Sequence, residues 1–233
     1  TGFADDTFRP GDPVSRQAMA AFMQRFADTD KLITSGNSHT CGVAFDSVWC
    51  WGNNGNNVEA LGDGGDAFRY LVPTRTIGLA SGVRAIEAAG SHTCALVDGS
   101  TPGQVWCWGS NQYGQIGDGT DVSPRGVPTQ VQGLPGPATD ISVGGSHTCA
   151  VVDGAAWCWG RNNDDQLGDD SGDDTNNPVQ VEGLTSGVTQ ISAGGRHTCA
   201  IVTGGLRCWG FNNTGQLGVG DIEGRATQAQ VTG

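Results

Sequence analysis

The sequence predicts an all-β fold, a β-propeller of four-stranded antiparallel blades, and three observations lead to it. One phrase recurs four times, centred on His39, His92, His147 and His197. Its period of about 50 residues is typical of propellers and repeat arrays. Each copy divides into four β segments, which is the strand number of a propeller blade. The 39 glycines fit short strands separated by many turns.

Residues 1–31 differ from the repeats and predict one short helix followed by a linker. Residues 2–10 have the composition of a loop, and Ser15 is a suitable N-cap. Apolar residues then follow at helical spacing: Met19, Phe22, Met23 and Phe26. A single short helix with one apolar stripe is not stable alone, so we expect it to dock on another part of the protein.

This first segment is similar to the second half of an S-layer homology motif, the bacterial module that holds exported proteins to cell-wall polysaccharide. The matching stretches are Gly-Phe-Ala-Asp-Asp-Thr-Phe-Arg-Pro at 2–10 and Pro-Val-Ser-Arg-Gln-Ala at 13–18. The resemblance implies that Arg16 occupies the position of the family's polysaccharide-contacting arginine. Because only part of one motif is present, the alternative is a docking helix left from a longer anchor.

From residue 32 onward, each repeat contains a hairpin whose register the turn sequence sets. In the third repeat, Asp153-Gly154 is a strong two-residue turn signal. Counting back from this turn places Cys149 directly opposite Cys158. The fourth repeat has the same register around Thr203-Gly204, whereas the first repeat has the same spacing around a poor turn sequence.

Of the 105 pairings that eight cysteines allow in principle, the register therefore favours four disulfides within repeats. The expected pairs are Cys41–Cys50, Cys94–Cys107, Cys149–Cys158 and Cys199–Cys208. Such bridges indicate an oxidising, extracytoplasmic environment. The alternative is zinc, because each His-x-Cys followed by a second cysteine offers three possible ligands. We interpret the recurring histidine as a structural hydrogen-bonding residue, and expect no confident metal site.

The repeats are expected at about 32–82, 83–138, 139–187 and 188–233. In the second repeat, the four β segments are predicted at 83–88, 92–97, 104–108 and 128–131. The alternation in Trp-Cys-Trp places both indoles on the face opposite the sulfur, where they pack between blades or form an aromatic surface. A further phrase, Asn-x-x-Gly-Gln-Leu-Gly, recurs between the third and fourth segments and supplies turn residues and one buried apolar side chain.

These phrases, Gly-x-His-Thr-Cys-Ala-Leu, Trp-Cys-Trp-Gly and Asn-x-x-Gly-Gln-Leu-Gly, occur in this order across residues 32–233. In this respect the chain resembles the regulator of chromosome condensation repeat. The resemblance implies a β-propeller, normally of seven blades, so four repeats are fewer than expected. The ring is either incomplete, closed with four blades, or completed by blades from other chains.

The charge balance of 12 basic against 24 acidic residues, a net charge of −12, argues against nucleic acid as a partner. No apolar run approaches the ~20 residues that cross a bilayer, so we expect no membrane insertion. The acidic residues concentrate in loops that are either solvated or able to bind calcium. The candidates for calcium are Asp63, Asp66, Asp118, Asp121, Asp169 and Asp173.

No nucleophile, phosphate-loop or zinc-protease motif is present, and no catalytic residue is predicted. An enzyme would have to use carboxylates such as Asp63, Asp118 and Asp169, which follow a recurring Leu/Ile-Gly. A glycosidase needs two carboxylates about 5 to 10 Å apart. We expect no enzymatic activity, with a secreted carbohydrate-active enzyme as the alternative.

The sequence therefore predicts a non-enzymatic extracellular bacterial protein, at the cell surface or secreted, whose rigid propeller presents loops. Its expected partners are a protein, a cell-wall glycan, or other copies of itself in an oligomer or filament joined through open blade edges. The repeat resemblance also permits a secreted enzyme inhibitor, or a nuclear exchange factor for a small GTPase, which conflicts with the disulfides. Because the chain starts at Thr1, we expect a processed product or fragment.

Overall fold

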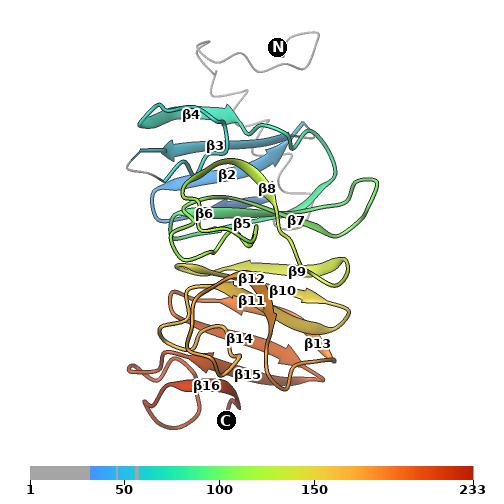
Figure 1. Cartoon of the computed structure of the whole chain (residues 1–233), viewed down its shortest axis with the longest axis vertical. Helices are drawn as coiled ribbons and strands as arrows, with labels where there is room; N and C mark the ends of the chain where they lie inside the picture. Colours follow the sequence, from blue (N-terminus) through green and yellow to red (C-terminus); the bar gives the residue numbers. More distant parts are fainter. Residues whose placement is uncertain (1–31, 46, 56–57, 233) are drawn as a thin grey trace.

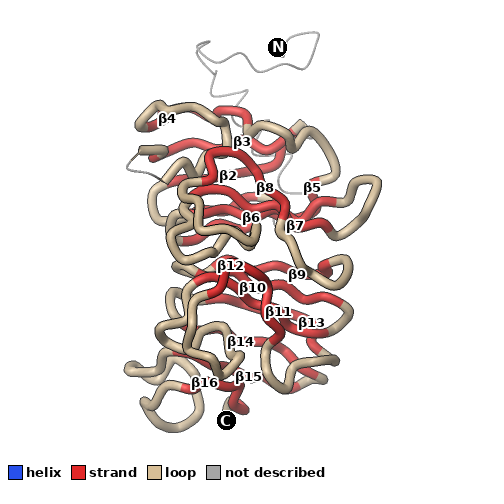
Figure 2. Tube along the Cα trace, viewed as in Figure 1, coloured by secondary structure: helices blue, strands red, loops and turns tan. Residues whose placement is uncertain are grey.

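The computed structural model describes residues 32–45, 47–55 and 58–232, and within these it contains sixteen β-strands and no helix. The strands form four separate four-stranded antiparallel sheets, shown in Figure 2. The all-β, propeller-type prediction is thus confirmed. The predicted N-terminal helix and Arg16 lie outside the described residues. No helix in the described part of the chain is long and apolar enough to span a bilayer.

Each sheet is one blade, and its strands follow in sequence order from one edge to the other. The first blade contains β1 (Ile33–Ser35), β2 (His39–Ala44), β3 (Ser47–Asn53) and β4 (Arg69–Arg75). The second contains β5 (Val83–Ala89), β6 (His92–Val97), β7 (Gln104–Gly109) and β8 (Arg125–Gln130). The third contains β9 (Ala138–Val143), β10 (His147–Val152), β11 (Ala155–Gly160) and β12 (Thr175–Gln180). The fourth contains β13 (Val188–Ala193), β14 (His197–Val202), β15 (Gly205–Gly210) and β16 (Arg225–Gln230).

The four blades stack in a row, with the first and fourth at opposite ends of the molecule (Figure 1). The first strands of successive blades contact one another: β1 touches β5, β5 touches β9, and β9 touches β13. This order is that of a propeller whose first strands line the inside. The described blades form an open arc, because the fourth does not return to the first (Figure 1).

The central hairpins have the register that the turn sequences predict. In the third blade, Cys149 pairs with Cys158 and Val152 pairs with Ala155. Asp153 and Gly154 both have positive φ, of 50° and 75°. Two consecutive positive φ angles are the mark of a type I′ turn, whose twist matches that of the flanking strands. Thr203 and Gly204 repeat this conformation in the fourth blade.

The fourth segment of the second repeat was predicted at 128–131. The strand is present, but its predicted start is three residues too late, because β8 runs from Arg125 to Gln130. Arg125 pairs with Gly109 across a register shift between Cys107 and Gly109. The pairing of β8 with β7 therefore continues beyond this register shift, which the alternation of apolar and polar residues does not reveal. Pro128 is accommodated because β8 is the outer strand of its sheet, where a missing N–H is tolerated.

The hydrophobic core lies between neighbouring blades. The second and third blades share a cluster that contains Leu96, Val105 and Ile116 on one side and Ile141, Ala150 and Trp159 on the other. Corresponding clusters join the first blade to the second and the third to the fourth. Trp108, Trp159 and Trp209 are completely buried. These three indoles therefore pack between blades, which is the first of the two predicted roles.

Candidate functional site

Each blade is fastened by one disulfide between its two central strands. The bonds join Cys41 to Cys50, Cys94 to Cys107, Cys149 to Cys158 and Cys199 to Cys208, and no described cysteine is free. The Cα atoms are 4.1 Å apart in each pair. This is close to the spacing of directly opposed residues at a non-hydrogen-bonded position. Because both sulfurs of every repeat are oxidised, the zinc interpretation has no thiolate ligands.

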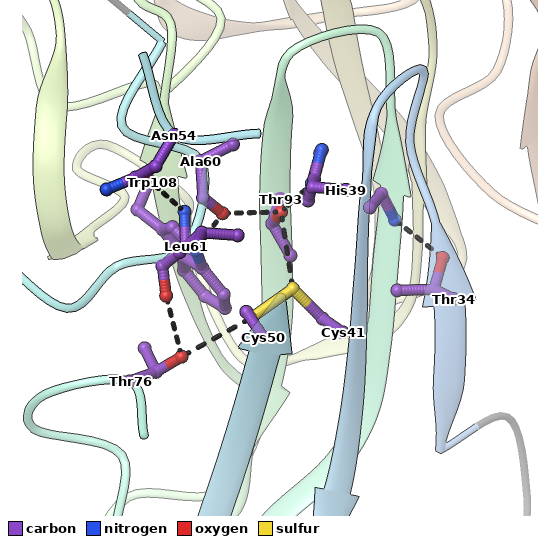
Figure 3. The surroundings of a disulfide bond; sticks show 11 residues. Thr34, His39, Cys41, Cys50, Asn54, Ala60, Leu61, Thr76, Thr93 and Trp108 are labelled. Atoms are coloured by element: carbon purple, nitrogen blue, oxygen red, sulfur yellow. Dashed lines mark hydrogen bonds between the residues drawn. A yellow bond between two sulfur atoms is a disulfide. The ribbon is translucent and has the colours of Figure 1, made fainter. Parts of the chain in front are cut away.

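A histidine and a threonine connect each blade to the next. His39 Nε2 lies 2.7 Å from Thr93 Oγ1, and the disulfide Cys41–Cys50 lies beside this contact (Figure 3). His92 and Thr148 make the same contact at 2.9 Å, and His147 and Thr198 also at 2.9 Å. In the first three blades the recurring histidine is thus a structural hydrogen-bonding residue, as the sequence predicts.

The same threonine and a tryptophan converge on one backbone carbonyl of the preceding blade. Ala60 O accepts hydrogen bonds from Thr93 Oγ1 at 3.4 Å and from Trp108 Nε1 at 2.8 Å (Figure 3). Gln115 O accepts from Thr148 and Trp159, and Gln166 O accepts from Thr198 and Trp209. A hydroxyl has one proton, so a threonine that donates to the carbonyl must accept from histidine Nε2–H.

Burial keeps these histidines neutral. Desolvation lowers the pKa of His92 and of His147 to about 3, and that of His39 to about 4. Neutral histidines protonated at Nε2 are the form that the threonine contacts require. We call the set of histidine, threonine, carbonyl and tryptophan the blade junction. It occurs three times with the same atoms.

The loop phrase Asn-x-x-Gly-Gln-Leu-Gly has a buried anchor that was not among the predicted site residues. Its first asparagine is buried in every blade, at Asn54, Asn111, Asn162 and Asn212. The side-chain oxygen of Asn162 accepts from Leu167 N at 3.0 Å, while its amide donates to Asp169 Oδ1 at 2.9 Å. Asn111 binds Ile116 N and the carbonyls of Thr120 and Val122 in the same way. The recurrence of Asn at this position was the signal that could have identified it.

The predicted acidic residues mostly shape their own loops. Asp118 Oδ1 accepts from Thr120 N at 3.0 Å, and Asp118 Oδ2 accepts from Arg125 Nε at 2.6 Å. Asp169 accepts from Ser171, and Asp63 accepts from Gly65 N. Asp121 instead reaches the next blade, where Asn176 Nδ2 donates to it at 3.0 Å.

Asp66 and Asp173 are exposed, and no described group of three or more His, Cys, Asp or Glu side chains is arranged to hold a metal ion. Calcium at these loops stays a prediction.

A polar groove lies between the loops of the second and third blades. Its volume is about 340 Å³, and its walls are Gln112, Tyr113, Asp121, Asp174, Thr175 and Asn176. The groove is thus lined by carboxylates, side-chain amides and one aromatic ring. Arg161 covers the Tyr113 ring at 5.0 Å, which holds this ring against the third blade. The sequence does not reveal this groove, because its two walls are more than fifty residues apart.

The loop beside this groove carries further negative charge. Burial, then the neighbouring carboxylates of Asp170, Asp164 and Asp169, raise the pKa of Asp165 above its ordinary value. Asp164 is itself bound by Arg196 of the fourth blade, whose guanidinium stacks on Phe211 at 4.2 Å. The loop face of the second and third blades is therefore acidic and polar. The ion pair between Asp164 and Arg196 fixes this face to the fourth blade.

Relatives of the chain are found among large proteins. It is 36% identical to the human E3 ubiquitin-protein ligase HERC2 over 139 residues, 58% of this chain and 3% of HERC2. It is 41% identical to the zebrafish (Danio rerio) E3 ubiquitin-protein ligase MYCBP2 over 78 residues, 33% of this chain and 2% of MYCBP2. The chain thus spans a small part of these curated relatives.

Two crystal structures have the same fold. Human WBSCR16 superposes with a TM-score of 0.71 at 22% identity, over 88% of this chain and 56% of WBSCR16. Saccharomyces cerevisiae Prp20p superposes equally well, over 86% of this chain and 50% of Prp20p. The four blades therefore match about half of each of these structures.

Two family models of the regulator of chromosome condensation (RCC1) repeat match the chain. One matches residues 102–151 and 153–201, and the other matches 83–115 and 188–216. Together they span more than half of the sequence. The chain therefore belongs to the RCC1 repeat family.

Proposed function

We propose that this chain is a non-enzymatic extracellular scaffold, at the cell surface or secreted, whose disulfide-fastened blades present acidic loops to a positively charged segment of a protein partner. The observation that carries the proposal is the polar groove between the second and third blades. Two carboxylates, Asp121 and Asp174, line it together with the Tyr113 ring. Carboxylates attract lysine and arginine side chains, and the Tyr113 ring already holds one guanidinium, that of Arg161, at 5.0 Å.

The loops that form the groove are held in place before any partner arrives. Asn111 and Asn162 are buried and bind their loops through both ends of the side-chain amide. A surface ordered in advance loses less conformational entropy on binding. The net charge of −12 also steers basic partners toward the chain.

Protein binding fits what is described for one protein of this fold, since Prp20p has binding properties to Gsp1p and histones. The oxidised state of every described cysteine supports a location outside the reducing cytosol. The scaffold would act as a rigid display of loops, in which the blades supply the positions and the loop residues supply the specificity.

Fluorescence anisotropy tests the proposal with a labelled Lys/Arg-rich peptide and a Glu/Asp-rich peptide of equal length. We expect the basic peptide alone to bind, and the double variant Asp121→Asn/Asp174→Asn to weaken it about fivefold to tenfold, as for partly exposed charge pairs. Glu182→Gln, an exposed acid outside the groove, is the matched control and should bind normally. Equal binding of both peptides, or unchanged binding by the double variant, would contradict the proposal.

A further inference from the structure

The two ends of the blade row expose surfaces that are buried at every internal junction. On the fourth blade, Ile201 and Leu206 are 38% and 43% exposed. Their counterparts on the third blade, Val151 and Ala156, are 1% and 0% exposed, because the fourth blade covers them. We call the side of the fourth blade formed by His197, Ile201, Leu206 and Gln216 the fourth-blade flank.

The opposite end has the complementary surface. Ile33 is 43% exposed, whereas its counterparts Ile86 and Ile141 are 0% and 2% exposed against the preceding blade. Trp51 is half-buried, although Trp108, Trp159 and Trp209 at the same position are completely buried. We call the surface formed by Ile33, Thr40 and Trp51 the first-blade flank.

The polar atoms on these flanks are the two unmatched halves of one blade junction. Within residues 32–45, 47–55 and 58–232, neither His197 Nε2 nor the Gln216 carbonyl makes a hydrogen bond. Likewise, in that part of the chain, Thr40 Oγ1 and Trp51 Nε1 have none. At internal junctions, a histidine and a carbonyl of one blade bind a threonine and a tryptophan of the next. The fourth-blade flank carries an unbound histidine and carbonyl, and the first-blade flank carries an unbound threonine and tryptophan.

Backbone packing leaves room for such a contact. A Cβ atom placed on Gly145 would lie 2.5 Å from the carbonyl oxygen of Gly195 in the next blade. Gly195, at the same position of the fourth blade, has nothing within 4 Å of its Cβ position. The close approach that requires glycine at residue 145 is thus available but unused at residue 195.

We propose that the fourth-blade flank binds the first-blade flank of a second copy of this chain and repeats the contacts of the internal blade junction. His197 donates to Thr40 of the second copy, and Gln216 O accepts from its Thr40 and Trp51, while Ile201 and Leu206 pack against Ile33. The contact joins two different surfaces, so it produces rings or filaments. Two copies of the four described blades make eight, which is within the range of closed propellers, so a closed dimer is the simplest product. This association uses surfaces other than the loop groove and does not depend on it.

Sedimentation velocity of the full chain at about 1 to 100 µM, a range that spans ordinary interface affinities, tests the proposal. We expect a species of twice the 24.0 kDa chain mass, or larger oligomers, in proportions that rise with concentration. Gly195→Leu should abolish association, because its side chain occupies the space that the second copy needs. Gly99 also has nothing within 4 Å of its Cβ position. Gly99→Leu is therefore the matched control, and it should associate normally.

Thr40→Val should weaken association about tenfold, because it removes a hydroxyl that would bind both the histidine and the carbonyl. At a concentration where both proteins are monomeric, its melting temperature should equal that of the wild type, since the hydroxyl has no hydrogen-bond partner among the described residues. A wild-type chain that remains monomeric throughout, or a Gly195→Leu variant that associates normally, would overturn the proposal.

Mixing two blocked variants tests the head-to-tail arrangement itself. Ile33→Asp blocks the first-blade flank, and Gly195→Leu blocks the fourth-blade flank. Each variant should be monomeric alone, but the mixture should form a heterodimer, because each variant keeps the flank that the other has lost. A mixture in which both chains remain monomeric, when the wild type associates, would contradict head-to-tail docking.

Discussion

His147 Nε2 lies 2.9 Å from Thr198 Oγ1, across the junction of the third and fourth blades and 51 residues apart in the sequence. Both residues belong to copies of the same phrase, so the phrase supplies the donor of one junction and the acceptor of another. Repeating it along the chain therefore builds identical junctions in succession. The blade-to-blade contacts are encoded by the repeat itself rather than by separate residues.

His147→Ala should lower the free energy of unfolding by about 2 to 4 kcal/mol, because it leaves a buried cavity and removes the bond to Thr198. His197→Ala removes the same side chain at the end of the described blade row, and in the monomeric chain it should cost about 1 kcal/mol or less. Urea unfolding with the disulfides intact measures both variants. Equal losses would show that the histidine does not act through the junction.

Stability should fall as the pH is lowered from about 6.5, the ordinary histidine pKa, toward 3. The pKa of His92 and of His147 is about 3 in the folded chain. In this interval the unfolded chain binds protons that the folded chain does not, so stability is fully present above pH 6.5 and is lost on acidification. One such group changes stability by about 1.4 kcal/mol per pH unit.

Unfolding measured between pH 7 and pH 5 checks this dependence before most carboxylates titrate. The variant His147→Gln lacks one of the titrating groups and should show a shallower slope than the wild type. Identical slopes would mean that His147 is not held neutral by burial.

Gly117→Ala should destabilise the chain more than Gly218→Ala. Both glycines have positive φ, of 76° and 65°, so both variants incur a backbone cost of about 1 to 2 kcal/mol. A Cβ atom at Gly117 would lie 2.6 Å from the buried Trp159 Nε1 of the next blade, whereas at Gly218 the nearest atom is Val231 Cγ1 at 3.1 Å. The clash should add about 1 to 3 kcal/mol to the cost of Gly117→Ala. Thermal unfolding of the pair measures the difference, and equal melting temperatures would refute it.

Removing one disulfide should weaken the fold without abolishing it. Cys149 and Cys158 are separated by 9 residues, and closing so short a loop contributes about 2 to 3 kcal/mol in the chain-entropy model. The variant Cys149→Ala/Cys158→Ala should therefore keep its β circular dichroism spectrum and unfold at lower denaturant concentration. Loss of the folded spectrum would show that the bridges define the fold rather than reinforce it.

The strand register and the disulfide pairing could be predicted because they depend on local sequence. The Asp153-Gly154 turn fixes which residues of the hairpin are opposite, and the pairing of Cys149 with Cys158 follows from counting. The start of β8 at Arg125 could not be found in this way, because the strand resumes after an irregularity near Gly109.

The groove and the loop anchors depend on contacts between distant segments. Asn162 resembles a turn residue in the sequence, but the loop that folds back over it makes it a buried anchor. Tyr113 and Asp174 come together only after the second and third blades have packed side by side. Alternation and spacing describe single strands and hairpins, so they do not reveal surfaces between blades.

We expect each blade to be closed by its own disulfide, as in a protein that works outside the reducing cytosol. Alkylation and non-reducing peptide mapping of native protein, isolated without reductant, measure this pairing. The expected result is no alkylated cysteine and four links, Cys41–Cys50, Cys94–Cys107, Cys149–Cys158 and Cys199–Cys208. Free thiols at these positions, or links between different blades, would contradict it.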